Sequence, residues 1–176
     1  MPAPHVPLPA CEHDTAFAFL ASALRRDPVL QRHVKTWRNW EGKATDGDAP
    51  NPQTCPFVRI TPISQGIAQR FDNTTTFLPF TLLVELAVAG DQPLALQRLA
   101  AQVRRVLFPT DAVLAADWDA KCLAVGISRL SLQSSPVGVP YAPAANAEPA
   151  QLNWPMIAGQ VRVVVDLYVQ TQPTPT

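Results

Sequence analysis

The sequence predicts an α+β fold in which a largely antiparallel sheet of four strands carries helices packed on one face. Residues 80–88 and 159–171 alternate apolar and polar side chains, which is the period-2 pattern of half-buried strands. Residues 93–108 instead place apolar side chains at helical spacing. Hairpin-type connections favour antiparallel pairing, and the expected elements follow in the order helix, strand, strand, helix, strand, strand.

The bulk composition fits one domain with proline-rich segments. The chain has 176 residues, of which 47% are hydrophobic and 16% charged, so it can bury a core and has too few charges for a disordered chain. Many of its 19 prolines gather near the two ends and in one internal segment. We therefore expect a flexible arm at 1–12, a single domain at 13–171 with a proline-rich loop at about 136–156, and a flexible tail at 172–176.

The first expected helix begins at Asp14, whose side chain can cap it. Arg25 and Arg26 fall in its last turn, where cations interact favourably with the helix dipole. Its apolar residues recur at i, i+3, i+4 and i+7 and therefore share one face: Phe17, Leu20, Ala21 and Leu24.

A second, short helix is expected from Asp27 and Pro28, which form a cap followed by a first-turn proline. Residues 41–56 have the composition of a loop. Three further residues keep helical spacing within the second helix: Leu30, Val34 and Trp37.

A short strand is expected at residues 57–63, and Pro62 either ends it or places it at a sheet edge. The polar, turn-rich residues 64–76 then form a long hairpin connection with Asp72 and Asn73 at its tip. This connection leads into the strand of residues 80–88.

The stretch from residue 80 to residue 109 predicts a strand followed by an amphipathic helix. Gly90 and Asp91 end the strand, Asp91 and Pro93 begin the helix, and Pro109 ends it. The core-facing residues are Phe80, Leu82, Val84, Leu86 and Val88 on the strand and Leu96, Leu99, Val103 and Val106 on the helix.

The last part of the chain predicts one helical turn at 112–116 and two more strands. In the strand that starts at Leu123 the apolar residues are odd-numbered up to Ile127 and even-numbered from Leu130, and such a change of phase indicates a bulge. In the final strand the odd residues are apolar, whereas most even residues are polar and face water or a partner.

The shared phase of two strands and one helix predicts a common core. We expect these residues to be buried together: Leu82, Val84, Leu86, Leu99, Val103, Val163, Val165 and Leu167.

The cysteines and the N-terminal residues favour a reducing cytoplasm. Cys11, Cys55 and Cys122 are odd in number and widely spaced, so we expect three free thiols. The first residues lack the charged and apolar regions of a secretion signal, and no apolar run has the length of a membrane span.

No motif predicts catalysis, a metal site or a cofactor. The cluster at residues 11–13 lacks the second pair of ligands that a metal needs. Asp111, Asp117 and Asp119 do not have the spacing of a calcium loop, and caps or solvated positions explain them. The formal net charge of zero gives no support for a protein that holds DNA by its phosphates. We therefore expect no enzyme.

Taken together, these elements resemble the tail terminator or tail-completion proteins of long-tailed bacteriophages and prophages. The matching features are a helix ending in LRRDPVL, a PFVRITP strand, the strand FTLLVELAV, the helix LALQRLAAQVRRVLFP and two final strands, which together cover residues 14–134 and 157–171. The proline-rich insertion at 136–156 departs from the family pattern. The resemblance implies a ring, commonly a hexamer, at the head-proximal end of the tail tube, where it stops tube growth and joins the tail to the neck without catalysis.

In such a protein the expected partners are further copies of the chain, the tail tube protein and a neck or connector protein. DNA passes through the lumen without specific binding, and the protein, assembled in the host cytoplasm, ends in the virion. The alternatives are another head–tail connector and, from another class, a small α+β domain that binds a ligand. The candidate subunit interface consists of Tyr141, Trp154, Met156, Arg162, Asp166 and Tyr168.

Overall fold

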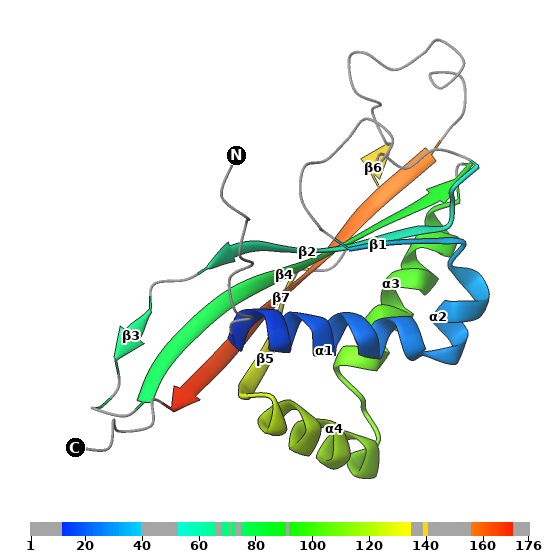
Figure 1. The fold of residues 1–176 in the computed structure, drawn as a ribbon. Coiled ribbons are helices and arrows are strands. Elements are labelled where there is room, and N and C mark those ends of the chain that lie inside the picture. The colour runs from blue at the N-terminus through cyan, green and yellow to red at the C-terminus, as the bar shows by residue number, and fades with distance from the viewer. Residues whose placement is uncertain are drawn as a thin grey trace, which may run out of the picture.

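The structure, a computed structural model, describes residues 12–39, 53–65, 68–70, 72, 75–90, 92–134, 139–140 and 156–170. The first half of this part contains α1 (Glu12–Arg26), α2 (Pro28–His33), β1 (Thr36–Asn39), β2 (Phe57–Gln65), β3 (Gln69–Arg70) and β4 (Thr75–Ala89). The second half contains α3 (Pro93–Leu107), α4 (Ala112–Ala124), β5 (Ile127–Ser134), β6 (Val139–Pro140) and β7 (Met156–Gln170) (Figure 1).

The strands form one mixed sheet in the order β1-β2-β4-β7-β5, while β3 pairs with β4 and β6 pairs with β7 outside this order. Only β1 and β2 run parallel, and all other pairs are antiparallel. The predicted α+β class and the largely antiparallel sheet are confirmed, since the four expected strands correspond to β2, β4, β5 and β7. The predicted number of strands is wrong, because β1, β3 and β6 add pairings that the sequence pattern did not indicate.

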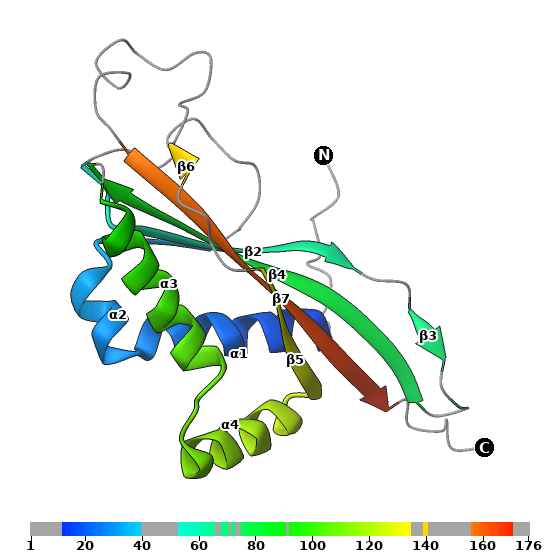
Figure 2. The ribbon, with the colours of Figure 1, turned by 180° about the vertical axis from the view of Figure 1, so that it is seen from behind.

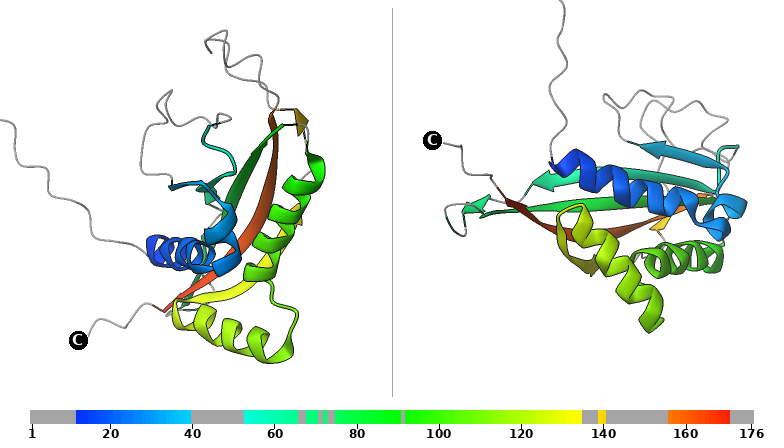
Figure 3. Two further views of the ribbon diagram at one scale, coloured as in Figure 1. Left: turned by 90° about the vertical axis from the view of Figure 1, so that its right-hand side faces the viewer. Right: turned by 60° about the horizontal axis from the view of Figure 1, so that its bottom comes forward.

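The two central strands, β4 and β7, have one face that is buried and a second face that no described helix covers. β4 and β7 are each 15 residues long and pair along their whole length, from Thr75 opposite Gln170 to Ala89 opposite Met156. The even residues of β4 and the odd residues of β7 belong to one buried cluster, which also includes residues of all four helices. In the right-hand view of Figure 3 the helices lie on the viewer's side of the sheet. All eight residues predicted to form the core belong to this cluster, so that prediction is confirmed.

The N-terminal helices agree largely with the sequence pattern. α1 begins at Glu12, two residues earlier than predicted, so Asp14 lies in its first turn and not at the N-cap position. Leu20, Ala21 and Leu24 are buried on the predicted face. Asp27 caps α2 as predicted, because its carboxylate accepts a hydrogen bond from the backbone N–H of Leu30 at 2.8 Å. A cap of this kind stabilises a helix by about 1 kcal/mol.

The predicted extension of the second helix to Trp37 is wrong, because α2 ends at His33 and Trp37 lies in β1. The backbone N–H groups of Lys35 and Thr36 both donate to the carbonyl oxygen of Pro56, at 2.8 and 3.3 Å. These bonds draw the chain out of the helix and align it beside β2.

The strand predicted at residues 57–63 corresponds to β2. This strand runs on to Gln65 with a register shift after Pro62, and β1 pairs only with residues 57–60, so Pro62 does lie where β1 no longer covers the edge.

The region between α3 and β5 departs most from the predictions. A full helix, α4, replaces the single expected turn, and Asp111 caps it by accepting hydrogen bonds from two backbone N–H groups at 3.0 Å. Leu123 therefore lies in a helix, and the strand expected from that residue begins only at Ile127, after a turn at Gly126 with φ +83°. The predicted bulge is confirmed, since the pairing of β5 with β7 shifts between Ile127 and Arg129.

Several predictions concern segments outside the described residues. The arm up to residue 11, the tail at 172–176 and most of the loop at 136–156 belong to these segments, as does Cys11. Within that loop the structure describes β6, which pairs with Ile157 and Ala158 of β7. None of the helices in the described part of the chain combines the length and the apolarity needed to cross a membrane.

Candidate functional site

Three of the six predicted interface residues lie together on the second face of β7. Arg162, Asp166 and Tyr168 have the even phase, opposite to the buried odd phase, and no described helix packs on this side. Arg162 and Tyr168 are exposed, and Asp166 is half-buried. A guanidinium N–H of Arg162 donates to the side-chain oxygen of Gln160 at 3.3 Å. This face therefore offers charged and aromatic groups to solvent or to a partner, as the alternation predicted.

Side-chain pairs across the strands order the same face. Arg59 of β2 and Glu85 of β4 are directly opposite, and their side chains form an ion pair with a 2.5 Å contact. The rings of Phe77 and Tyr168 lie with centroids 5.6 Å apart at an interplanar angle of 54°. Cross-strand pairs of these types each contribute roughly 0.2–1 kcal/mol, so they hold the face in one conformation.

Met156 begins β7 at the far end of this face and is only 6% exposed. It packs in a small cluster with Cys55, Phe57 and Ala87, and its sulfur lies 3.8 Å from the Cys55 sulfur. Its side chain is thus part of the packing of the subunit and leaves little surface for a neighbour, contrary to its place in the predicted interface. The other two predicted residues lie outside the described part of the chain: Tyr141 and Trp154.

The two described cysteines are buried free thiols. Burial raises the pKa of Cys55 from 9.0 to about 11, while the positive charge of Lys35 opposes the rise. Burial also raises the pKa of Cys122 to about 11, and the carboxylate of Asp119 adds to the rise. Because the thiolate is the nucleophile, neither side chain is activated for covalent chemistry.

An apolar outer side of α4 is the main surface that the sequence pattern did not predict. The inner side of α4 packs on the subunit through the buried Cys122 and through Trp118, whose ring stacks on Phe19 of α1 with centroids 5.2 Å apart. α4 carries apolar residues on its outer side as well as on its inner side, and that composition was the available signal. Three large apolar side chains are exposed on α4: Val113 (77%), Leu114 (60%) and Leu123 (64%).

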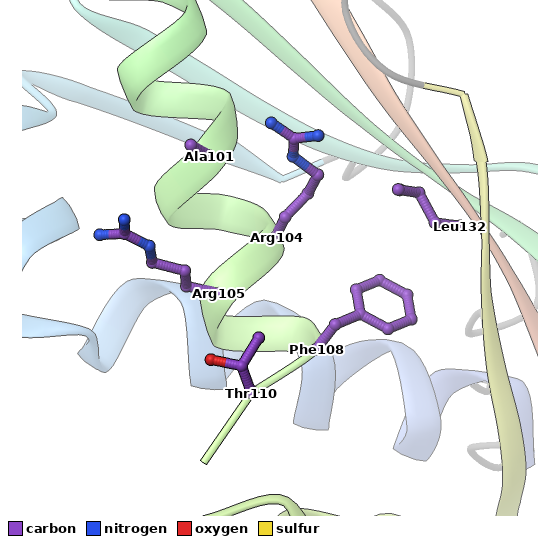
Figure 4. A pocket seen from close by; sticks show the side chains of 6 residues that line it. All are labelled: Ala101, Arg104, Arg105, Phe108, Thr110 and Leu132. Carbon is purple, nitrogen blue, oxygen red and sulfur yellow. The ribbon is translucent and has the colours of Figure 1, made fainter.

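An open hollow of about 310 Å³ lies between the C-terminal half of α3 and β5 (Figure 4). In Figure 4, Phe108 points toward Leu132 across it, whereas Arg105 points away. Its volume is at the lower end of the range for ligand pockets, about 300–1,000 Å³. Among the described residues, the lining offers two guanidinium groups and a hydroxyl but no carboxylate, imidazole or thiol, and so no acid–base pair. It consists of Ala101, Arg104, Arg105, Phe108, Thr110 and Leu132.

Candidate ligand residues have structural roles where the structure describes them. Within the described ranges, no group of three or more His, Cys, Asp or Glu side chains is placed to hold a metal ion. The ring of His13 packs edge-on against Phe80 at a centroid distance of 5.6 Å. Asp111 caps α4, and Asp117 pairs with Lys121 at 2.6 Å, as expected for caps and solvated helix positions.

Comparisons with known proteins do not assign the chain to a family. No protein-family model matches it, and no curated protein matches its sequence.

Proposed function

We propose that the protein is a structural virion protein, a tail terminator that forms a ring at the head-proximal end of a phage tail. The ring ends the growth of the tail tube and joins the tail to the neck. The observation that carries the proposal is the division of the molecule into a helix-covered face that holds the core and outer surfaces that are rich in contact groups. The resemblance in the order and patterns of the elements supports it.

The central pair of strands suits a ring subunit. β4 and β7 pair along 15 residues each and are buried on one side by helices, so the subunit resists bending. A stiff subunit keeps its two contact surfaces at a fixed angle, and a fixed angle is what allows head-to-tail contacts to close into a ring. Such a role needs no catalytic group.

The proposal assigns partners to the outer surfaces. Further copies of the chain, commonly six in this kind of ring, would contact one another laterally, while the tube protein and a neck protein would bind the two ends of the ring. Arg162, Asp166 and Tyr168 on β7 are the described candidates for these contacts. DNA would pass through the lumen, and the formal net charge of zero suits a lumen that does not grip phosphates.

Deletion of the gene from its phage or prophage, followed by electron microscopy of the particles, tests the function. We expect overlong tail tubes that are not joined to heads, and we expect the gene supplied in trans to restore normal particles. Tubes of normal length that fail to join heads would assign the protein to the neck instead. Normal tails joined to heads would rule out both roles.

A further inference from the structure

We propose that the apolar outer side of α4 binds the opposite edge of the sheet of a second copy of this chain, in a head-to-tail contact. The outer side of α4 is defined by Val113 and Leu123, which lie on the side of the helix away from Cys122 and Trp118, and the opposite edge, here called the α2–β1 edge, by Val29, Arg32, Lys35 and Arg38. The proposal rests on the proposed function for the closure of such contacts into a ring. The contact itself rests on the charges, the exposure and the topology of the subunit.

The first argument is apolar surface. Val113 and Leu123 on α4 are 77% and 64% exposed, although the inner side of the same helix already anchors it to α1 and β5. The α2–β1 edge carries its own exposed apolar side chain, Val29, at 44%. Apolar side chains grouped within a polar rim mark interaction surfaces, and the outer side of α4 has this composition.

The second argument is charge. α2, its cap and β1, residues 27–39, contain three exposed cations, Arg32, Lys35 and Arg38, and one carboxylate, Asp27, which gives this segment a net charge of +2. α4 and its cap contain three carboxylates and one ammonium group, which gives this segment a net charge of −2. The arginines that precede α4 belong to the lining of the hollow beside α3. A basic edge therefore faces an acidic helix when two copies meet head to tail, and such complementarity fixes the partner and the orientation.

The third argument is topology. β1 and β5 are the two outer strands of the sheet order, and α2 leads directly into β1 (Figure 1). α4 leads into β5 (Figure 2). The two surfaces therefore belong to opposite edges of one subunit. When two copies meet through different surfaces, one copy keeps a free α4 and the other keeps a free α2–β1 edge. Further copies can therefore add at both ends, and the chain of subunits closes into a ring if the angle between neighbours allows it. A two-fold contact of α4 with α4 would instead place Asp117 and Asp119 near their own copies, which is unfavourable.

Disulfide trapping of the purified protein tests the contact. In a Cys11→Ser background, in which Cys55 and Cys122 are buried, one variant carries Val29→Cys and another carries Leu123→Cys. We expect the equimolar mixture to form a disulfide-linked dimer of twice the subunit mass under mild oxidation, whereas each variant alone stays monomeric. The matched control is Leu94→Cys, which is 56% exposed in the first turn of α3 and outside both surfaces.

Two results would overturn the inference. Dimers of Leu123→Cys alone, formed as readily as in the mixture, would show a two-fold contact of α4. A mixture that forms no more dimer than Leu94→Cys mixed with Val29→Cys would show that α4 and the α2–β1 edge do not meet. The disulfide test needs no phage, so its result is independent of the gene deletion. If the dimer is trapped but the deletion strain makes normal particles, only the proposed function is wrong. If the deletion strain makes overlong tails but no dimer is trapped, only this inference is wrong.

Discussion

Replacing Val165 with alanine tests whether β7 turns its odd-numbered residues toward the core. Val165 is 0% exposed and lies between Phe80 of β4 and Leu130 of β5 in the paired register. The change removes two buried carbon groups, each worth about 0.8 kcal/mol, and leaves a cavity with strands on both sides that cannot easily collapse. We therefore expect the free energy of unfolding to fall by about 1.5–3 kcal/mol.

Val164→Ala is the matched control, since Val164 is the next residue of the same strand and lies half-buried on the opposite face. Urea unfolding followed by circular dichroism gives both free energies, and equal m-values would show that the unfolded states are comparable. Val164→Ala should cost less than about 1 kcal/mol. Equal costs for the two variants would refute the assignment of faces, because a strand shifted by one residue exchanges them.

Asp27→Ala should lower the free energy of unfolding by about 1 kcal/mol in the same assay, because α2 loses its cap, whereas Asp27→Asn should retain most of the stability; equal losses would argue against capping. Cys55 and Cys122 should resist alkylation until the protein unfolds, as mass spectrometry would show. Burial raises the pKa of both thiols from 9.0 to about 11, so their contribution to stability is complete below pH 9 and is lost as the pH rises through 11. Stability should therefore fall over this range more in the wild type than in a variant with alanine at both positions. A double-mutant cycle on Arg59 and Glu85, which are 27% and 26% exposed, should give a coupling of about 1 kcal/mol or less that weakens with salt; a salt-independent coupling would contradict this exposure.

The parts of the fold that follow from local periodicity were predictable. The period-2 pattern of β4 and β7 assigned Leu82 and Val163 to the core, and the change of phase before Leu130 revealed the bulge in β5. The cap at Asp27 was predictable because it needs only the carboxylate and the next few backbone N–H groups. Such features depend on neighbours in the sequence, which is why they can be recognised without the structure.

The parts that depend on distant contacts were not predictable. Trp37 fits a helical pattern with Leu30, and only its pairing with Val58, on a strand beyond a long loop, places it in β1. α4 has apolar residues on both sides, so its period is weak and its end at Leu123 resembled the start of a strand. The candidate interface also depended in part on contacts between residues that are distant in the sequence. The phase of β7 placed Tyr168 on the outer face correctly, whereas the burial of Met156 depends on Cys55, Phe57 and Ala87, which are far from it in the sequence.

The outer side of α4 also bears on when the subunits assemble. A polar residue at Val113 or Leu123 would leave the inner contacts of the helix unchanged, so the fold of one subunit does not require these apolar side chains. At their observed exposures, complete burial of Val113 and Leu123 would contribute about 2–4 kcal/mol. Bringing two free subunits together costs about 4–15 kcal/mol in lost translational and rotational freedom, so a single contact holds a pair weakly. In a closed ring every subunit makes two such contacts, and the last contact to form joins partners that are already linked. The same contact can therefore pair free subunits only transiently, which oxidation to a disulfide accumulates, and still be strong enough to close a ring once a tube end has gathered them.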